Sequence, residues 1–361
     1  MLFILRSFCM AYTPNDQPPK KDQVHSDDNT YISGYGFVAT DPRMLQEQHL
    51  KKNVAVIAVA MVGVILLPTF FLVPVTVVMQ TVVSALSKTT NQFVLIATLA
   101  QEARELILYL LSVLLPICFL RFFLRDGSIE AAVRKLPDKK TWIYAVPLTL
   151  TVVALAGVGS QFINSLLFQL HIVPLTPNNM LPGNNISLAF YLVRVMFLPA
   201  VLEEYLFRGL ILNSLRRHGD TFAVVLSSVF YGMMQYTVTR NLSGFVFGIV
   251  LGYFVLRTGS VLTAVICHLG ASAVGSVIVL VQHFLPAHYE LVENILFIAI
   301  LAVGIVSFIF LCTRESNAFI ISDTNNTTST AHKLKLCLSN GAFIIVLLLW
   351  AWQMFRSVQI F

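Results

Sequence analysis

Three ionisable residues lie inside a stretch of this chain that is mostly apolar. The stretch runs from Leu188 to Leu212, and it contains Glu203, Glu204 and Arg208. It is long enough to cross the hydrocarbon of a bilayer as a helix. An ionisable side chain at that depth costs roughly 2.5–3.5 kcal/mol, and such residues are usually paired or functional. We therefore interpret the three residues as the mark of a buried site in which a carboxylate acts on water.

The two glutamates are expected to have different roles. Glu204 and Arg208 are four residues apart, so they share one face of a helix and can form an ion pair. Glu203 is rotated by about 100° from Glu204 and has no obvious partner, which leaves its carboxylate free to face a cavity as a general base. The alternative is that all three residues form an ion network that only braces neighbouring helices.

Two later apolar stretches each carry a polar pair with helical spacing. Gln235 follows Tyr231 by four residues, and Ser272 follows His268 by the same interval. The Gln235 amide can donate to and accept from a ligand, but it is not a useful base. An imidazole and a hydroxyl could donate to a developing oxyanion, although a lone histidine in an apolar helix is often only a packing residue. We predict that three helices bring these side chains around one polar pocket.

The composition places the chain among membrane proteins. Hydrophobic residues make up 57% of the chain and charged residues only 12%, and the mean hydropathy is +0.77. These values exclude an ordinary soluble domain. Apolar stretches of roughly 20 residues recur along the chain, which favours membrane helices over a β-barrel. The sequence predicts an all-α polytopic membrane bundle with eight to nine transmembrane helices.

The predicted spans alternate with short polar connections. A further stretch, Thr90 to Glu105, is predicted to be an amphipathic re-entrant or interfacial segment. The spans are Asn53 to Val78, Leu106 to Leu124, Trp142 to Val158, Phe190 to Leu212, Phe222 to Tyr236, Gly244 to Leu256, Val261 to Val281, Ile295 to Cys312 and Ala342 to Phe355.

Polar segments divide the chain into four parts. Residues 1–52 are expected to form a disordered cytoplasmic tail, and residues 53–312 the membrane domain. A polar, low-complexity linker is predicted over residues 313–340, before a final transmembrane helix over residues 341–361.

The distribution of positive charge predicts the orientation. The connections 171–185 and 282–294 contain no Lys or Arg, whereas most basic residues fall between spans on the other side. The positive-inside rule then places the N-terminus in the cytoplasm of a multi-pass protein of the cell membrane. The net charge of +6 is explained in the same way. Since the basic residues are not interleaved with aromatic residues, we expect no nucleic-acid partner.

Small residues and cysteines also have structural interpretations. Gly244, Gly248 and Gly252 recur every four residues, a pattern that lets two membrane helices approach closely. The five cysteines are dispersed without CxxC spacing, so we expect reduced thiols rather than a metal site or a redox pair.

Three sequence blocks resemble one family. The blocks EEYLFRG, SSVFYGMMQ and GFVFGIVLGYFVLRTGSVLTAVICH resemble the CPBP membrane proteases, which include CAAX prenyl endopeptidases and bacteriocin-processing or immunity proteins. The similar part runs from about Val195 to Val281, and the resemblance implies a family core over about residues 142–312. In that family the first Glu of EExxxR and the His of FxxxH are thought to activate water, and a later HxxxN or HxxxD pair stabilises the oxyanion. The resemblance therefore makes Glu203 the base.

The chain departs from the family pattern at two positions. FxxxH ends in Gln235, and HxxxN, which begins at His268, ends in Ser272. Losing one positioned acid or base typically lowers a rate by about 10²- to 10⁴-fold, so the resemblance implies a degenerate site. Although the family is often described as metalloproteases, a catalytic zinc needs at least three protein ligands, and only His268 and the two glutamates remain. We therefore expect no cofactor and no metal.

These observations lead to one preferred hypothesis and two alternatives. The preferred hypothesis is an intramembrane endopeptidase in which Glu203 activates water against a peptide bond of a membrane-associated peptide or protein. Membrane lipids would surround it, and the sequence does not indicate an oligomeric state. The second hypothesis is an inactive pseudo-protease that binds a peptide as an immunity or regulatory factor. A transporter ranks lowest, because the chain lacks paired halves with matched broken helices.

Overall fold

The computed structural model describes residues 29–32, 36–39, 42–88, 92–124, 132–133, 135–137, 139–175, 181–182, 184–314, 318, 321 and 328–360. The chain divides into two units, Met1–Gln48 and His49–Phe361. In the first unit, β1 (Asn29–Ile32) and β2 (Gly36–Ala39) form an antiparallel hairpin. The disorder predicted for residues 1–52 is wrong for the part that the structure describes, which contains this hairpin and, from Pro42, the start of a long helix. Residues 1–28 lie outside the described residues.

The second unit is a bundle of long apolar helices. Seven helices in the described part of the chain are long and apolar enough to cross a membrane, and a pair bent by 77° is an eighth candidate. This result confirms the predicted all-helical polytopic bundle. The main helices are α1 (Pro42–Leu86), α2 (Phe93–Phe123), α4 (Lys139–Gln169), α8 (Asp220–Met233), α9 (Val238–Thr258), α10 (Val261–Phe284), α11 (Tyr289–Arg314), α12 (Thr330–Leu338) and α13 (Gly341–Arg356).

One further long span carries the glutamates. It runs from Asn185 to His218, and we call it the glutamate span. Two stretches of it have π-helical hydrogen bonding, a feature frequent at functional sites, and they flank Glu203 and Glu204. Its segments are α5 (Asn185–Leu192), η2 (Val193–Phe197), α6 (Leu198–Glu204), η3 (Tyr205–Leu212), α7 (Asn213–Leu215) and η4 (Arg216–His218).

Two of the nine predicted spans are not spans by themselves. Helix α8 has 14 residues, which at 1.5 Å per residue reach only about 21 Å, less than the hydrocarbon thickness. Helix α13 qualifies only together with α12, and α12 lies inside the segment predicted to be a polar linker. Of the eight to nine spans predicted, the described residues therefore contain seven, or eight if α12 and α13 form one span. An apolar stretch buried within a bundle has the same composition as one that crosses the membrane, so composition does not separate the two cases.

The prediction of a re-entrant or interfacial segment over Thr90 to Glu105 is also wrong. Helix α2 begins at Phe93 and continues without interruption to Phe123, so most of the stretch from Thr90 to Glu105 is the first half of a span. The charged residues in this half suggested an interfacial segment. One of them, Glu102, is buried against Arg194 of the glutamate span, which explains how the bundle accommodates it.

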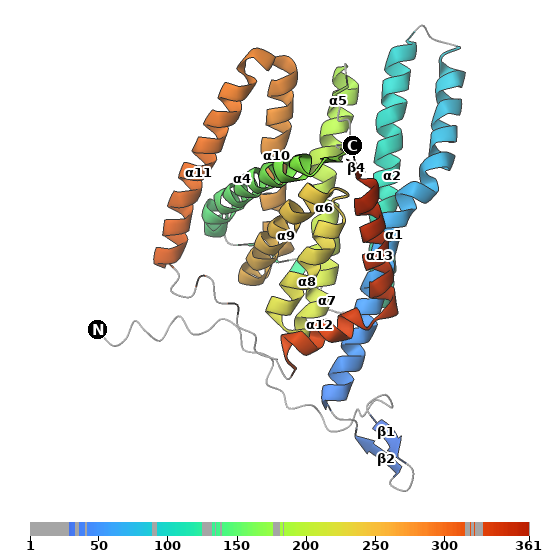
Figure 1. Cartoon of the computed structure of the whole chain (residues 1–361), viewed down its shortest axis with the longest axis vertical. Coiled ribbons are helices and arrows are strands. Elements are labelled where there is room, and N and C mark those ends of the chain that lie inside the picture. Colours follow the sequence, from blue (N-terminus) through green and yellow to red (C-terminus); the bar gives the residue numbers. More distant parts are fainter. Residues whose placement is uncertain are drawn as a thin grey trace. The chain divides into compact units, whose positions relative to one another are not determined.

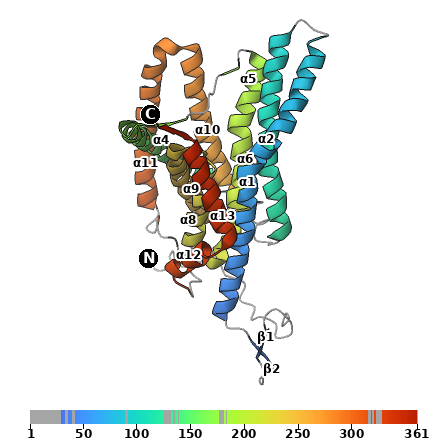
Figure 2. The same ribbon diagram turned by 45° about the vertical axis from the view of Figure 1, so that its right-hand side comes forward.

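The glutamate span and α8 lie in the middle of the second unit. Figures 1 and 2 show α6 and α8 at the centre, with α10 and α11 on one side and α1 and α2 on the other. Among the largest fully buried side chains are Arg208, Phe207 and Phe230, all from the glutamate span and α8. The most buried part of the bundle is thus the part that contains the predicted site.

Helices α8 and α9 approach closely at the glycines predicted to allow it. A Cβ atom added to Gly248 would lie 2.8 Å from Ser228 Cβ, and one added to Gly244 would lie 2.6 Å from Gln235 Cγ. Any larger residue would require the two helices to move apart. The glycine stripe therefore determines how closely α9 packs against the helix that leads to Gln235.

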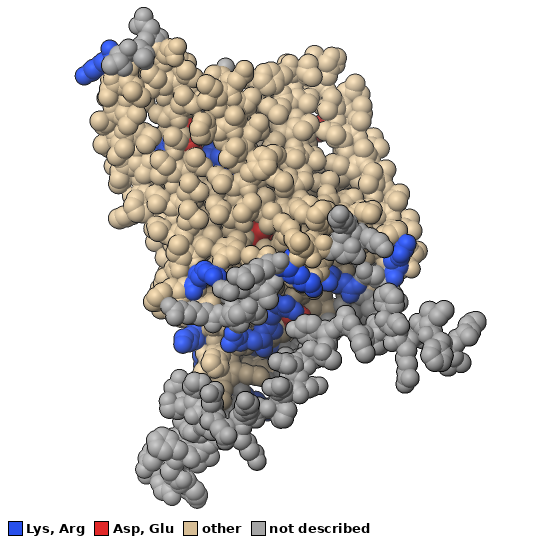
Figure 3. Space-filling model, turned by 180° about the vertical axis from the view of Figure 1, so that it is seen from behind, with Lys and Arg blue, Asp and Glu red and all other residues tan. Residues whose placement is uncertain are grey.

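Most of the described basic side chains gather at one end of the bundle. Figure 3 shows a band of Lys and Arg at this end, with few charges over the rest of the visible face. The helix ends on this side carry Arg121, Arg216, Arg217, Arg257, Arg314 and Lys335. This asymmetry agrees with the distribution from which we predicted the orientation. The cytoplasmic placement of the N-terminus stays a prediction.

Candidate active site

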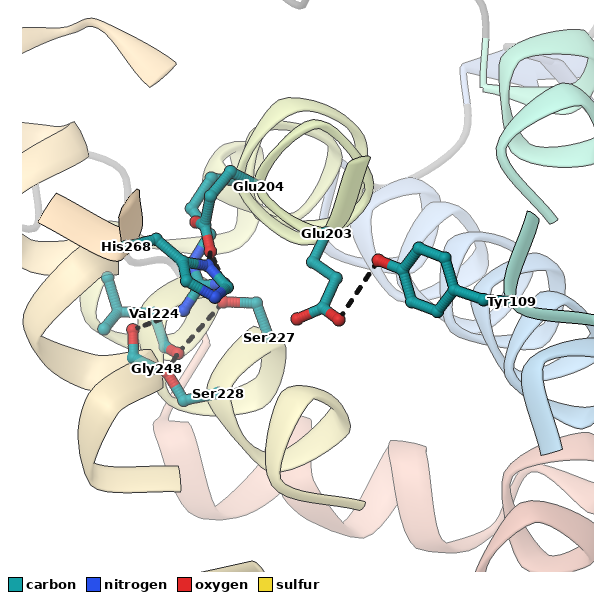
Figure 4. Close-up of polar contacts among 9 residues, drawn as sticks. Tyr109, Glu203, Glu204, Val224, Ser227, Ser228, Gly248 and His268 are labelled. Atoms are coloured by element: carbon teal, nitrogen blue, oxygen red, sulfur yellow. Dashed lines mark hydrogen bonds and ion pairs between the residues drawn. The ribbon is translucent and has the colours of Figure 1, made fainter. Parts of the chain in front are cut away.

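Glu204, Arg208 and His268 form a buried network that joins three helices. Glu204 Oε1 accepts a hydrogen bond from Arg208 Nη1 at 3.1 Å and lies 2.8 Å from His268 Nδ1. Arg208 Nη2 donates to the carbonyl oxygen of Gly248 at 3.2 Å. The predicted pair of Glu204 and Arg208 is present. The network connects the glutamate span to α9 and α10, as Figure 4 shows.

Aromatic rings surround this network and limit the access of water. The Arg208 guanidinium carbon lies 4.5 Å from the centroid of the Tyr231 ring, a cation–π contact. Phe207 packs edge-on against Tyr231 at 5.1 Å, and Phe247 packs in the same way against His268, also at 5.1 Å. The buried arginine is thus neutralised by Glu204 and covered by an aromatic face.

Glu203 lies outside this network and has a different partner. Its carboxylate points away from Glu204 toward α2, as Figure 4 shows, and its Oε1 accepts a hydrogen bond from the Tyr109 hydroxyl at 3.3 Å. The side chain is only 6% exposed, yet no Lys or Arg in the described ranges forms an ion pair with it. The Tyr231 hydroxyl is a second hydrogen-bond partner of the carboxylate, and His268 lies near enough to interact with it electrostatically. Glu203 is therefore a buried carboxylate that no cation neutralises by direct contact.

Gln235 lies in the turn between α8 and α9. Its side chain packs against Gly244, and it is half-buried. The next residue, Tyr236, has a left-handed backbone with φ of 60°, and it lies near enough to Glu203 to interact with it. The turn is thus beside the glutamates. Within the described residues, the Gln235 amide makes no hydrogen bond to Glu203 or His268.

Ser272 lies one turn beyond His268 on α10, where it is half-buried. In the part of the chain that the structure describes, its hydroxyl makes no hydrogen bond to the glutamates or to His268. Of the six predicted site residues, the structure brings four into one locality: Glu203, Glu204, Arg208 and His268. Gln235, in the turn between α8 and α9, and Ser272, on α10, lie beside these four residues and form no hydrogen bond with them within the described part of the chain.

Sequence reasoning missed Tyr109. It lies on α2, far from the glutamates in the sequence and outside the blocks that resemble a known family. The only signal for a site role of Tyr109 was its polar hydroxyl within an apolar span. This signal is weak, because a single tyrosine in such a span is also typical of a residue at the membrane interface. Sequence reasoning also gave Tyr231 no specific partner, whereas its ring covers the Arg208 guanidinium.

The described residues do not suit a zinc ion. No group of three or more His, Cys, Asp or Glu side chains among them is arranged to hold a metal. Glu204 and His268 come closest to forming such a group. However, the Glu204 oxygen that faces His268, Oε1, also forms the ion pair with Arg208. A zinc site with three protein ligands therefore does not fit the observed donor set.

One comparison with known proteins identifies part of this chain. Residues 185–274 match the family described as "Type II CAAX prenyl endopeptidase Rce1-like". The matched part contains the glutamate span, α8, α9 and the first half of α10, and so all six predicted site residues. Helices α1, α2, α11, α12 and α13 lie outside it. No curated protein and no solved structure matches the chain.

Proposed function

Because residues 185–274 form a domain of the Rce1-like type II CAAX prenyl endopeptidase family, we propose that this protein is an intramembrane endopeptidase. The observation that carries the proposal is that the two adjacent glutamates have different partners. Glu204 is neutralised by Arg208 and bonded to His268, whereas the buried Glu203 carboxylate has neutral phenols, those of Tyr109 and Tyr231, as its hydrogen-bond partners. A carboxylate without a cation retains the basicity that proton abstraction from water requires.

The proposed reaction follows from these positions. Glu203 takes a proton from a water molecule, and the resulting hydroxide attacks the carbonyl carbon of the scissile peptide bond. The carbonyl oxygen becomes an oxyanion that His268 and Ser272 stabilise as donors. Glu203 then returns its proton to the leaving nitrogen as the C–N bond breaks. Glu204 Oε1 lies 2.8 Å from His268 Nδ1, so in this proposal the imidazole carries a hydrogen on both ring nitrogens and donates to the oxyanion through Nε2.

Gln235 has a supporting role in this proposal. It stands where the family pattern has a histidine, and its amide can hold the attacking water by a hydrogen bond but cannot take its proton. We therefore expect a slow enzyme. The loss of one positioned base corresponds to a rate about 10²- to 10⁴-fold lower than that of a complete site.

The family description adds a substrate class that the sequence alone did not imply. A CAAX prenyl endopeptidase acts on a C-terminal Cys-a-a-X sequence whose cysteine carries a prenyl group. We propose the same class here, a prenylated C-terminus held at the membrane by its lipid. The test substrate is accordingly a farnesylated peptide that ends in Cys-a-a-X.

The test compares the native protein with Glu203→Gln and Gln235→His in proteoliposomes, using this peptide and mass spectrometry of the products. We expect slow cleavage by the native protein. Glu203→Gln should lower the rate at least about 100-fold, and Gln235→His should raise it about 10-fold or more, because it restores a proton acceptor beside the water. Equal cleavage by the native protein and Glu203→Gln would refute Glu203 as the base.

The replacement of histidine by Gln235 also favours a second candidate function, that of a pseudo-protease that binds a peptide without cleaving it. In that case the native protein would show no turnover, but it would bind the farnesylated peptide. Gain of cleavage by Gln235→His would then indicate descent from an active enzyme. The same experiment therefore separates the two candidates.

A further inference from the structure

Helix α2 lies outside the matched residues, yet polar contacts join it to the glutamate span at several levels. Near one end, Asn184 Nδ2 donates to Thr98 Oγ1 at 2.9 Å. Further along, Arg194 Nε and Nη2 each lie 3.3 Å from Glu102 Oε2, an ion pair in which the carboxylate is almost fully buried. Polar contacts between membrane helices are specific, since each donor must meet its acceptor.

The same interface continues past Glu203 to the other end of α2. Tyr109 donates to Glu203, and Arg121 Nη1 donates to the Tyr205 hydroxyl at 3.2 Å. The residues of α2 that make these contacts follow one another in the same order as their partners along the glutamate span. These contacts fix the position of α2 along the glutamate span, and so they fix which residue of α2 meets the buried carboxylate.

We infer that Tyr109 is a positioning residue of the proposed active site and that α2 is needed to complete that site. This inference rests on the proposed function of Glu203. Glutamate has three rotatable side-chain bonds, and Arg208 and His268 are close by on the same span and on α10. A Glu203 carboxylate that turned toward these groups would be neutralised, as Glu204 is. The hydrogen bond from Tyr109 holds the carboxylate turned toward α2.

The chemistry of the partner matters as much as its position. A phenol donates one hydrogen bond and carries no charge, whereas a lysine or arginine would neutralise the carboxylate. Tyr109 donates to Oε1, and the Tyr231 hydroxyl is also a hydrogen-bond partner of this carboxylate. A neutral donor can thus orient a general base without removing its basicity. Tyr109 supplies this neutral donor from α2, outside the residues that match the family.

The test removes one hydroxyl at a time from this interface. Tyr109→Phe keeps the ring and loses the bond to Glu203. Tyr205→Phe is the matched control, because it removes the hydroxyl that accepts from Arg121 across the same two helices. With the farnesylated peptide, we expect Tyr109→Phe to lower kcat about 10-fold or more with KM within about twofold, and Tyr205→Phe to change neither beyond about twofold.

A second readout does not depend on turnover. Dicyclohexylcarbodiimide modifies carboxyl groups in membranes, and mass spectrometry can locate the product on Glu203. We expect Tyr109→Phe to change the rate of this modification at least threefold, because the Glu203 carboxylate loses its hydrogen bond from Tyr109. Tyr205→Phe should leave the rate unchanged. If Tyr109→Phe matches the native protein in labelling, or in kcat where cleavage occurs, the inference is wrong. If cleavage survives Glu203→Gln while Tyr109→Phe still alters labelling, the proposed function fails and the contact stands.

Discussion

Glu203 and Glu204 are neighbours in the sequence, and the structure gives them opposite surroundings. One helical step rotates successive side chains by about 100°, which directs Glu204 toward Arg208 and His268 and Glu203 toward Tyr109. A buried carboxylate needs compensation for its lost hydration. Glu204 obtains it from an ion pair and an imidazole, and Glu203 from the phenols of Tyr109 and Tyr231. This difference in surroundings is the basis of the separate roles that we propose for the two residues.

At the scale of the residue, the pair of Glu204 and Arg208 should dominate local stability. Arg208→Met leaves the Glu204 charge buried without its cation, and we expect a loss of about 3–5 kcal/mol in the free energy of unfolding. The double variant Glu204→Gln with Arg208→Met should recover most of that loss, because it removes both charges. The measurement is unfolding in detergent micelles.

The matched control for this prediction is Arg216→Met. Arg216 pairs with Asp220 at the same four-residue spacing, but both side chains are partly exposed. Water already screens this pair, so its loss should cost no more than about 1 kcal/mol. Equal destabilisation by Arg208→Met and Arg216→Met would mean that burial does not govern the strength of the pair.

At the scale of the element, helices α8, α9 and α13 together hold the turn that carries Gln235. Trp350 Nε1 on α13 donates to Asn241 Oδ1 at 2.9 Å, and Asn241 Nδ2 donates to the carbonyl oxygen of Thr237 at 2.6 Å. Asn340, which caps the start of α13, donates to the carbonyl oxygen of Lys51 on α1. The final helix is thus part of the bundle rather than an independent anchor, although it lies outside the matched residues.

The close packing of α8 on α9 gives a prediction about Gly248. In Gly248→Ala the new Cβ would lie 2.8 Å from Ser228 Cβ and 2.9 Å from Ser228 Cα, so α8 and α9 must separate. The same movement would weaken the hydrogen bond from Arg208 to the Gly248 carbonyl. We expect a loss of about 1–3 kcal/mol in the free energy of unfolding and a lower rate of peptide cleavage.

Gly159→Ala is the control for this prediction. Gly159 lies on α4, and a Cβ added there would meet no atom within 4 Å. Because alanine also favours a helix more than glycine does, this variant should be as stable as the native protein or slightly more so. If Gly248→Ala were equally harmless in unfolding measurements, the close approach of α8 and α9 would not be a constraint.

At the scale of the whole molecule, the charge asymmetry predicts the orientation in the membrane. Lys335 lies at the basic end, on α12, and His288 lies between α10 and α11, where the connection contains no Lys or Arg. We expect Lys335→Cys to react with a membrane-impermeant thiol reagent only after the membrane is permeabilised, and His288→Cys to react in intact cells. The native protein, with its own cysteines, measures the background. The reverse pattern would place the N-terminus outside.

Several features of the protein were already determined by its sequence. Hydropathy determined the membrane class, because roughly 20 apolar residues per helix are needed wherever the helix lies in the bundle. Helical spacing determined the pair of Glu204 and Arg208, and small residues determined the contact of α9 with α8. These features depend on residues a few positions apart, and local geometry relates them directly.

The tertiary structure alone decided which helices meet and at what level. It placed His268 on Glu204 and Tyr109 on Glu203, and it lengthened α2 to 31 residues. The partners in each contact are separated by tens of residues or more, so their meeting depends on how whole helices slide and rotate against each other. A shift of one turn along α2 would move Tyr109 by about 5.4 Å, beyond the reach of its hydrogen bond.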